Sequence, residues 1–312
     1  MPLELGLASS HAPTMFASLD KWPRIYEILA GGVPQPLDAQ EETQEVLAAY
    51  AGRIKRGFGA LRSQLAAYKP DALIVVGDDQ NEVFGPSFRC SMAMYLGAEL
   101  SGSLNFGFLG EPLDQNHVHL RCHAELSRLL LARLVEEGFD FGWIEELRPI
   151  SRPAAGIGHA FSRPSHAMGV DEMGIPIIVL FLNAYDPPLP AARRCWDLGK
   201  AIRRVLGDRP ERIAIYGSGG LSHDPRGPRS GWIDEPLDRW VLDRIVQGRG
   251  EDLTSLFRFD SDTLRSGTGE IRSWITVAGA FEGRPATVVD YIPARHAVTG
   301  LGFAYWPLDG VG

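Results

Sequence analysis

The sequence predicts an α/β fold in which a central mixed β-sheet is flanked by helices. Short runs rich in Val, Ile and Leu recur along the chain, and such runs are typical of strands covered on both faces. Segments with helical spacing of apolar residues lie between them. No linker rich in Pro, Gly or Ser and no block of like charges interrupts this alternation, so we expect residues 1–312 to form a single domain.

Each expected strand is a short apolar run bounded by polar or turn-forming residues. Several of these runs are nearly continuous, which indicates strands in the middle of a sheet. The expected strands, in chain order, are Leu3–Ala8, Ala72–Gly77, Ser103–Leu109, Ile175–Asn183, Arg212–Gly217, Ala286–Tyr291 and Gly302–Trp306.

The longest expected helix, Ala39–Tyr68, separates the first two strands, and its apolar residues recur three and four positions apart. A second helix is expected over His117–Glu137, with Asp114 or Asn116 as its N-cap. The remaining expected helices are Ala191–Val205, Pro236–Gln247 and Glu270–Phe281.

Composition narrows the classes of function. Apolar residues make up 45% of the chain and charged residues 22%, as in ordinary globular proteins. The net charge of -8 gives no electrostatic reason to bind nucleic acid or an anionic membrane. No run approaches the roughly 20 apolar residues that span a bilayer, and the N-terminus lacks the basic and apolar regions of a signal peptide. Three cysteines without a CxxC spacing suit a reducing compartment, so we expect a cytoplasmic protein.

Four of the eight histidines lie in loops that follow a strand or open a glycine-rich turn: His11, His159, His166 and His223. Functional side chains collect at the carboxyl ends of strands in α/β sheets. His11 follows the first expected strand, and His223 follows the Gly-Ser-Gly-Gly run after the fifth. Both are therefore candidate site residues. For any one of them alone, the alternative is a loop histidine with an ordinary hydrogen bond.

Acidic residues mark two further candidate positions. Asp78, Asp79 and Gln80 follow a buried strand, so the two carboxylates are candidate metal ligands, or else turn residues that bond to the backbone. Glu270 opens an amphipathic helix after Gly-Thr-Gly; the alternative is that it only complements the helix dipole.

His119 and His123 stand four residues apart in the expected helix His117–Glu137, as two zinc ligands would. The glutamate of the H-E-x-x-H pattern is absent, because Leu120 occupies its place. A solvated helix face is the favoured interpretation of this pair.

The order of these motifs resembles one family. They are S-S-H-x-P at Ser9–Pro13, D-D-Q at Asp78–Gln80, G-x-G-H ending at His159, G-S-G-G-L-S-H at Gly217–His223 and G-x-G-E ending at Glu270. Over nearly the whole chain, from Gly6 to Gly302, the sequence resembles the class III (LigB-type) extradiol ring-cleavage dioxygenases. Within them it is similar to the catalytic subunits of protocatechuate 4,5-dioxygenase and to gallate and methylgallate dioxygenases.

The resemblance implies a role for each matching residue. His11 matches the first iron-ligand histidine and Glu270 the ligand carboxylate. His223 matches the catalytic acid/base, and His159 matches a histidine beside the oxygen site. Arg295 and His296 align with the loop that holds the substrate's carboxylate in protocatechuate-type enzymes, although Arg295 in a structural salt bridge is an equal alternative.

The sequence departs from the family at Gln80, where the second iron-ligand histidine is expected. Three interpretations remain open. Gln80 ligates through its amide oxygen; a neighbouring group (Asp78, Asp79, His159 or His166) replaces it; or the metal site is weakened or lost. An amide oxygen is a harder and weaker donor for Fe(II) than imidazole, so Zn or Mn is an alternative cofactor.

The function implied by the resemblance is a non-haem Fe(II) dioxygenase that cleaves the ring of a catecholic aromatic acid with O₂. The expected partners are a small aromatic substrate and O₂, in a homo-oligomer with or without a small accessory subunit. The alternatives are a non-oxidative metal-dependent hydrolase or lyase on the same scaffold, and a non-catalytic partner subunit.

Overall fold

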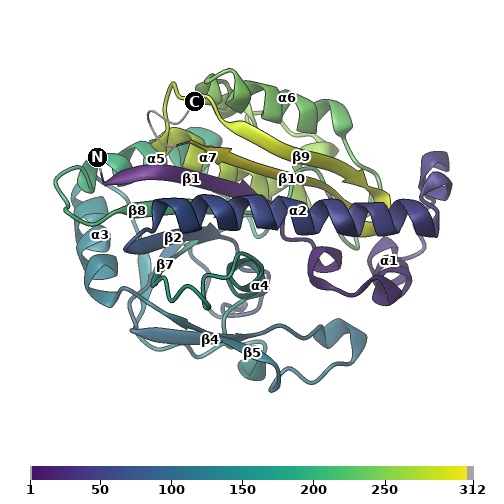
Figure 1. The fold of residues 1–312 in the computed structure, drawn as a ribbon, viewed down its shortest axis with the longest axis horizontal. Coiled ribbons are helices and arrows are strands. Elements are labelled where there is room, and N and C mark those ends of the chain that lie inside the picture. The colour runs from purple at the N-terminus through teal and green to yellow at the C-terminus, as the bar shows by residue number, and fades with distance from the viewer. Residues whose placement is uncertain (1, 308–312) are drawn as a thin grey trace.

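The computed structural model describes residues 2–307. Eight strands form one sheet in the order β6-β3-β7-β2-β8-β1-β10-β9 (Figure 1). Its four inner neighbours, β7, β2, β8 and β1, run parallel, and antiparallel pairings with β3 and β10 extend the sheet on either side. The strands are β1 (Leu3–Ser9), β2 (Ala72–Gly77), β3 (Met92–Tyr95), β6 (Gly142–Ile144), β7 (Ile177–Leu182), β8 (Ile213–Ser218), β9 (Thr287–Ala294) and β10 (Thr299–Trp306).

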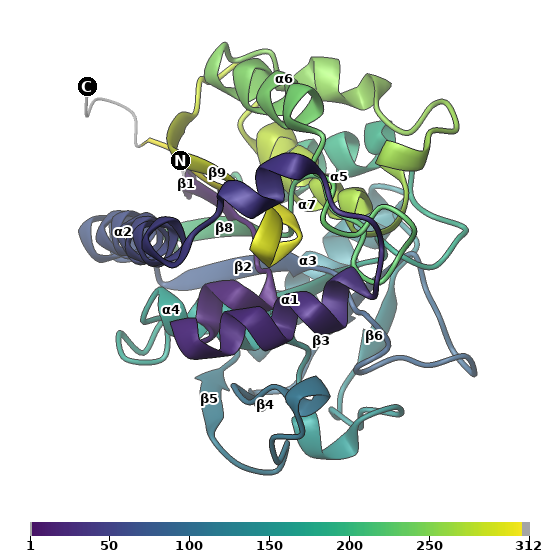
Figure 2. The ribbon, with the colours of Figure 1, turned by 90° about the vertical axis from the view of Figure 1, so that its right-hand side faces the viewer.

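Helices cover both faces of this sheet, and the side chains of β2 show the division. Leu73 and Val75 pack toward α2 and α4, whereas Ile74 and Val76 pack toward α3, α5 and α7. Figure 2 shows α4 and α7 on opposite sides of β2. The helices are α1 (Trp22–Ala30), α2 (Gln44–Tyr68), α3 (Ala124–Glu136), α4 (His159–Ala167), α5 (Ala192–Val205), α6 (Glu235–Val246) and α7 (Ile271–Ala280). The predicted α/β class with a mixed sheet is confirmed.

Six of the seven expected strands are present within one or a few residues of their predicted bounds, but Ser103–Leu109 is wrong. A separate two-stranded sheet pairs β4 (Glu99–Ser103) with β5 (His117–Arg121), and β4 ends where the predicted strand begins. The chain then turns through a short 3₁₀ helix, Gly107–Leu109, which Gly110 ends in the left-handed region at φ 83°. Glycine adopts that conformation without steric cost, which allows the turn.

The expected helix His117–Glu137 is wrong in its first part. Val118 and Leu120 are buried while His119 and Arg121 are exposed, which is the period-two pattern of a strand. The ring of His123 caps α3 by accepting a hydrogen bond from the backbone N–H of Leu126. His119 and His123 therefore do not share a helix face.

The long helix also starts later than expected: residues 37–41 form a 3₁₀ turn, and α2 begins at Gln44, where the Thr43 side chain caps it. The short elements α1, β3, α4 and β6 were not predicted from the sequence. None of the helices within residues 2–307 is long and apolar enough to cross a membrane.

Candidate metal centre and active site

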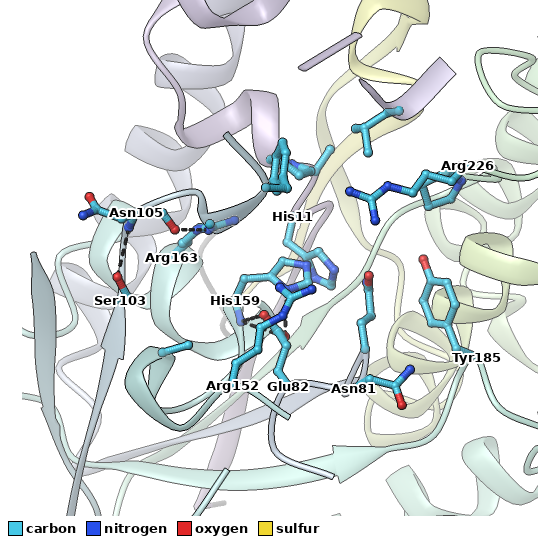
Figure 3. Close-up of a pocket in the computed structure, with 18 of the residues that line it drawn as sticks. His11, Asn81, Glu82, Ser103, Asn105, Arg152, His159, Arg163, Tyr185 and Arg226 are labelled. Atoms are coloured by element: carbon cyan, nitrogen blue, oxygen red, sulfur yellow. Dashed lines mark hydrogen bonds and ion pairs between the residues drawn. The ribbon is translucent and has the colours of Figure 1, made fainter. Parts of the chain in front are cut away.

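The candidate site lies at the carboxyl ends of the four parallel strands. His11 follows β1, Asp78 follows β2, Tyr185 follows β7 and His223 follows β8. These loops meet because parallel strands deliver their carboxyl ends to one edge of a sheet. They border a cavity of about 330 Å³ that is lined by His11, Tyr185 and His223, among others (Figure 3).

Three buried side chains, one of which is the cavity-lining His11, converge at this edge of the sheet. Nε2 of His11 lies 3.4 Å from Oε2 of Glu270 and 3.6 Å from Oδ1 of Asp78. One ligand atom from each of the three residues lies within 4.8 Å of the others. The structure thus brings His11, Glu270 and the end of β2 together, although His11 and Glu270 are 259 positions apart in the sequence.

The donor atoms of this cluster fit a divalent cation. His11 Nε2 and both carboxylate oxygens of Asp78 are buried and have no hydrogen-bond partner among residues 2–307. Buried polar atoms without partners are costly, and two carboxylates in one site repel each other. A cation with a charge of +2 would satisfy these atoms and neutralise both carboxylates.

The position of His11 is fixed by a chain of hydrogen bonds through Ser218. The Ser218 hydroxyl donates to the main-chain oxygen of Ala160, so it accepts the N–H at Nδ1 of His11, 3.0 Å away. In the neutral ring this arrangement puts the lone pair on Nε2, the nitrogen that faces the two carboxylates and that would bind a metal. Burial lowers the pKa of His11, but the charges of Glu270 and Asp78 outweigh it and raise the pKa to about 9. The pocket therefore attracts positive charge.

Glu270 is held by donors on both of its oxygens. Gln80 donates its amide N–H to Oε1 at 3.1 Å, and the backbone N–H of Gly220 donates to Oε2. Burial favours the neutral acid, yet His11 and His223 hold the pKa of Glu270 well below its usual range. A Cβ atom on Gly220 would lie 2.4 Å from the His223 ring, which explains the glycine at this position. In this arrangement the amide of Gln80 orients the carboxylate of Glu270.

Gln80→Ala should weaken metal affinity about 10–100-fold and leave the metal-to-protein ratio unchanged at saturation. That is the effect of removing an outer-shell partner that orients a ligand. Competition with a chelator of known affinity measures it. A loss of binding at saturating metal would instead show that the Gln80 amide is itself a ligand.

His223 is positioned to accept a proton. Its Nδ1–H donates to the main-chain oxygen of Leu221 at 2.9 Å, so the lone pair of the neutral ring is at Nε2. Nε2 faces the hydroxyl of Tyr185 at 3.2 Å and Oε1 of Glu270 at 3.4 Å. Burial lowers the pKa of His223, but Glu270 reverses this and the pKa is raised.

His159 begins α4, and its ring packs edge-on against His11 with 4.8 Å between the ring centroids. Glu82 accepts hydrogen bonds from both the backbone N–H and Nδ1 of His159, at 3.1 and 2.9 Å. Burial raises the pKa of Glu82, but His159 and Arg163 lower it to about 2, so this carboxylate is ionised. His159 lines the cavity, and with Nδ1 bonded to Glu82 its Nε2 is the ring nitrogen left to contact a ligand there.

The comparisons with known proteins agree with this geometry. Residues 7–301 match the family model described as the catalytic LigB subunit of aromatic ring-opening dioxygenase. The chain belongs to this family.

Curated relatives carry dioxygenase names. Gallate dioxygenase of Pseudomonas putida (strain KT2440) is 32% identical over 162 residues, which are 50% of this chain and 45% of that protein. A 2,3-dihydroxyphenylpropionate/2,3-dihydroxicinnamic acid 1,2-dioxygenase of Pseudomonas putida is 27% identical over 227 residues, 72% of this chain and 61% of its own. The chain thus spans about half the length of the curated relatives it matches. A crystal structure of an uncharacterized protein of Escherichia coli K12 shares the fold, with a TM-score of 0.54 at 14% identity over 96% of this chain and 99% of that one.

Two residues that the LigB resemblance assigned to the substrate lie outside the cavity. Arg295 forms ion pairs with Asp38 and Glu235. His296 bonds to Glu42 through Nδ1 at 2.7 Å and stacks on Tyr26. The structure therefore shows Arg295 in a structural salt bridge.

The residues considered as replacements for Gln80 occupy different positions in the fold. Asp79 accepts the backbone N–H groups of Val83 and Phe84, so it closes a turn. His166 is paired with Asp171 at the surface. Asp78, in contrast, joins His11 and Glu270, and His159 lies against the His11 ring.

Three residues of the site were not predicted from the sequence. Tyr185 lies in the loop after β7, and the rule that found His11 and His223 applies equally to it. Glu82 and Arg163 are near-neighbours of predicted residues, but only the fold shows that both approach His159.

A buried network in this LigB-family chain supports the His223 loop from behind. Asp238 on α6 accepts hydrogen bonds from the backbone N–H and the hydroxyl of Ser222, and from the hydroxyl of Tyr291. Burial raises the pKa of Asp238 to about 6, against three donors that lower it. The carboxylate fixes the residue that precedes His223.

Asp238 should make the protein more stable as the pH falls from 7 toward 4. A carboxyl whose folded pKa is about 6 binds a proton more readily than in the unfolded chain, where its pKa is near 3.8. Ionisation in the folded state is therefore unfavourable, and stability falls as pH rises through this window by about 2–3 kcal/mol. Unfolding of the parent and of Asp238→Asn, followed between pH 4 and 7, measures it. Parallel pH profiles for the two proteins would contradict the assignment.

Proposed function

We propose that this chain is a metal-dependent extradiol dioxygenase that opens the ring of a catecholic aromatic acid with O₂. One observation carries the proposal. Within residues 2–307, His11 Nε2 and the carboxylate oxygens of Asp78 have no hydrogen-bond partner, and with Glu270 they form a cluster that His11 joins to a cavity also lined by His159 and His223. Relatives named as dioxygenases of gallate and of 2,3-dihydroxyphenylpropionate support the choice of substrate class. We further propose that the protein acts in the cytoplasm as a homo-oligomer.

His11, Asp78 and Glu270 are the proposed protein ligands, with Fe(II) as the metal. When bound, the metal supplies Lewis acidity toward the vicinal hydroxyls of the catechol and a site for O₂. The orienting contacts of Ser218, Gln80 and Gly220 hold the imidazole and Glu270 in fixed directions, so little reorganisation is needed when substrate arrives.

His223 is the proposed general base and acid. A catechol must lose at least one hydroxyl proton, and Nε2 of His223 carries the lone pair that can take it. The same nitrogen then returns a proton later in the reaction. Tyr185 hydrogen-bonds this nitrogen and holds the ring toward the cavity. His159 donates its Nδ1–H to Glu82, so Nε2 of its neutral ring is a hydrogen-bond acceptor beside His11, where it can accept a hydrogen bond from a hydroxyl of a bound ligand.

Metal analysis of anaerobically purified protein, combined with O₂ uptake on a panel of catechols, tests the proposal. We expect one Fe(II) per chain and one O₂ consumed per catechol, with appearance of a ring-opened product. Catecholic acids bound without O₂ consumption, with stoichiometric Fe(II) present, would overturn it.

The donor set favours a second candidate. One histidine and two carboxylates are harder than the two-histidine set of many non-haem iron oxygenases, and they suit Zn or Mn as well. A hydrolase or lyase that uses His223 as its general base is the function to test next. It would turn over its substrate under strictly anaerobic conditions.

A further inference from the structure

A buried arginine without an acidic partner lines the cavity. Arg163 is only 7% exposed, and its one hydrogen bond within residues 2–307 runs from Nη2 to the main-chain oxygen of Asn105 at 2.7 Å. Its Nε has no hydrogen-bond partner among these residues. Its guanidinium stacks on the ring of Phe106, 4.2 Å from the centroid, which fixes its plane without neutralising its charge.

The acids whose charges act on Arg163 are already engaged. Glu82 accepts the two hydrogen bonds from His159, and Glu111 pairs with Lys21 and accepts the backbone N–H of Phe106. Neither forms an ion pair with Arg163 in the described part of the chain. Burial lowers the pKa of Arg163 to about 10, which reflects a cation whose desolvation is not fully compensated. Buried charges in proteins are ordinarily paired. The guanidinium of Arg163 therefore has a place for a negatively charged partner that residues 2–307 do not fill.

The position of Arg163 on α4 determines how far its side chain lies from the proposed metal ligands. His159 and Arg163 are four residues apart on α4, so they lie on one face, about 6 Å apart along the axis. His159 contacts His11, and Arg163 therefore stands one helical turn farther from the metal ligands. Figure 3 shows Arg163 beside Asn105, on the side of the cavity away from Tyr185 and Arg226.

We infer that Arg163 is the specificity-determining residue that binds an anionic substituent, a carboxylate, at the end of the substrate opposite the two hydroxyls. This inference rests on the proposed function. The hydroxyls occupy the His11–Asp78–Glu270 end, and the carboxylate supplies the negative charge that the buried guanidinium lacks. Arg163 takes the recognition role that the sequence suggested for Arg295, whose guanidinium is occupied by Asp38 and Glu235.

Binding to the Zn(II)-loaded protein, measured by calorimetry in the absence of turnover, tests the inference. The ligands are 3,4-dihydroxybenzoate and its methyl ester, which share the catechol but differ in charge. In Arg163→Gln we expect the acid to bind about 10–100-fold more weakly, as for loss of a charged hydrogen bond, and the ester to bind as in the parent. Arg226→Gln, at an exposed arginine of the same cavity, is the matched control and should leave the acid-to-ester ratio unchanged.

Arg163→Lys keeps the charge but not the planar fork, and it should show a smaller loss that is still specific for the acid. This variant decides the matter if Arg163→Gln does not fold. Equal weakening of acid and ester, or an acid-specific loss in Arg226→Gln, would overturn the role of Arg163 and leave the proposed function standing. A parent protein that binds neither ligand would overturn both.

Discussion

Replacing Asp78 by alanine should abolish stoichiometric metal binding. In the part of the chain that the structure describes, both oxygens of Asp78 lack hydrogen-bond partners and one of them faces His11, so no hydrogen bond there competes with coordination. We expect the metal affinity to fall by more than the roughly 100-fold that follows removal of a residue that only orients a metal ligand. Metal content after anaerobic reconstitution and gel filtration measures it.

Asp79→Asn is the matched control for this change. Asp79 is the adjacent acid, but its oxygens accept the N–H groups of Val83 and Phe84, and asparagine keeps one acceptor there. We expect its metal content to equal that of the parent.

The stability of the metal-free protein gives a second readout. Burial and the charge of Glu270 raise the pKa of Asp78 well above its usual range, so Asp78→Asn should not lower the melting temperature of the metal-free protein at neutral pH. Full metal occupancy in Asp78→Ala would contradict the proposed ligand set.

Replacing His223 by glutamine should lower kcat about 10²–10⁴-fold while the metal stays bound. This is the usual contribution of a positioned general acid or base. Glutamine is uncharged and its amide reaches the position of Nε2, but it cannot take up a proton at neutral pH. Turnover and metal content, measured on the same preparation, separate a proton-transfer role from a ligand role.

His166→Gln is the control for general effects of losing a histidine. His166 is 46% exposed in its side chain and pairs with Asp171 at the surface, so its replacement should leave kcat unchanged. Loss of metal from His223→Gln would reassign His223 as a ligand. Unchanged turnover with the metal retained would remove it from the mechanism.

The local sequence patterns predicted the sheet well because its inner strands are buried on both faces. The bounds of β2 are those predicted, because a six-residue run without polar residues, Ala72–Gly77, is typical of a strand buried on both faces. The hairpin of β4 and β5 was mispredicted because only one of its faces is buried. Its alternating pattern at Val118 and Leu120 is short, and it adjoins the true helix α3.

The candidate site was predicted where a residue follows a strand, and not where it depends on tertiary packing. Strand-end placement identified His11, His223 and the Asp78–Gln80 segment. The pattern alone does not choose between Asp78, Asp79 and Gln80, because one residue more or less along a loop reverses the direction of a side chain. Arg163 carried no local signal: its burial arises from the packing of α4 against β4, and its lack of a partner shows only when every nearby acid is located.

The small sheet of β4 and β5 supplies part of the cavity wall, and the large sheet positions the residues that would carry the chemistry. Ser103 at the end of β4, and Asn105 and Phe108 in the segment that connects the two strands, contribute to the cavity wall. In contrast, His11, Asp78 and His223 follow strands of the large sheet. Replacements or insertions in the connection between β4 and β5 would change the shape of the cavity wall and leave the loops that carry His11, Asp78 and His223 unchanged. New substrate ranges could therefore be engineered by exchanging residues 104–116 between relatives, with the reactive centre retained as a constant module.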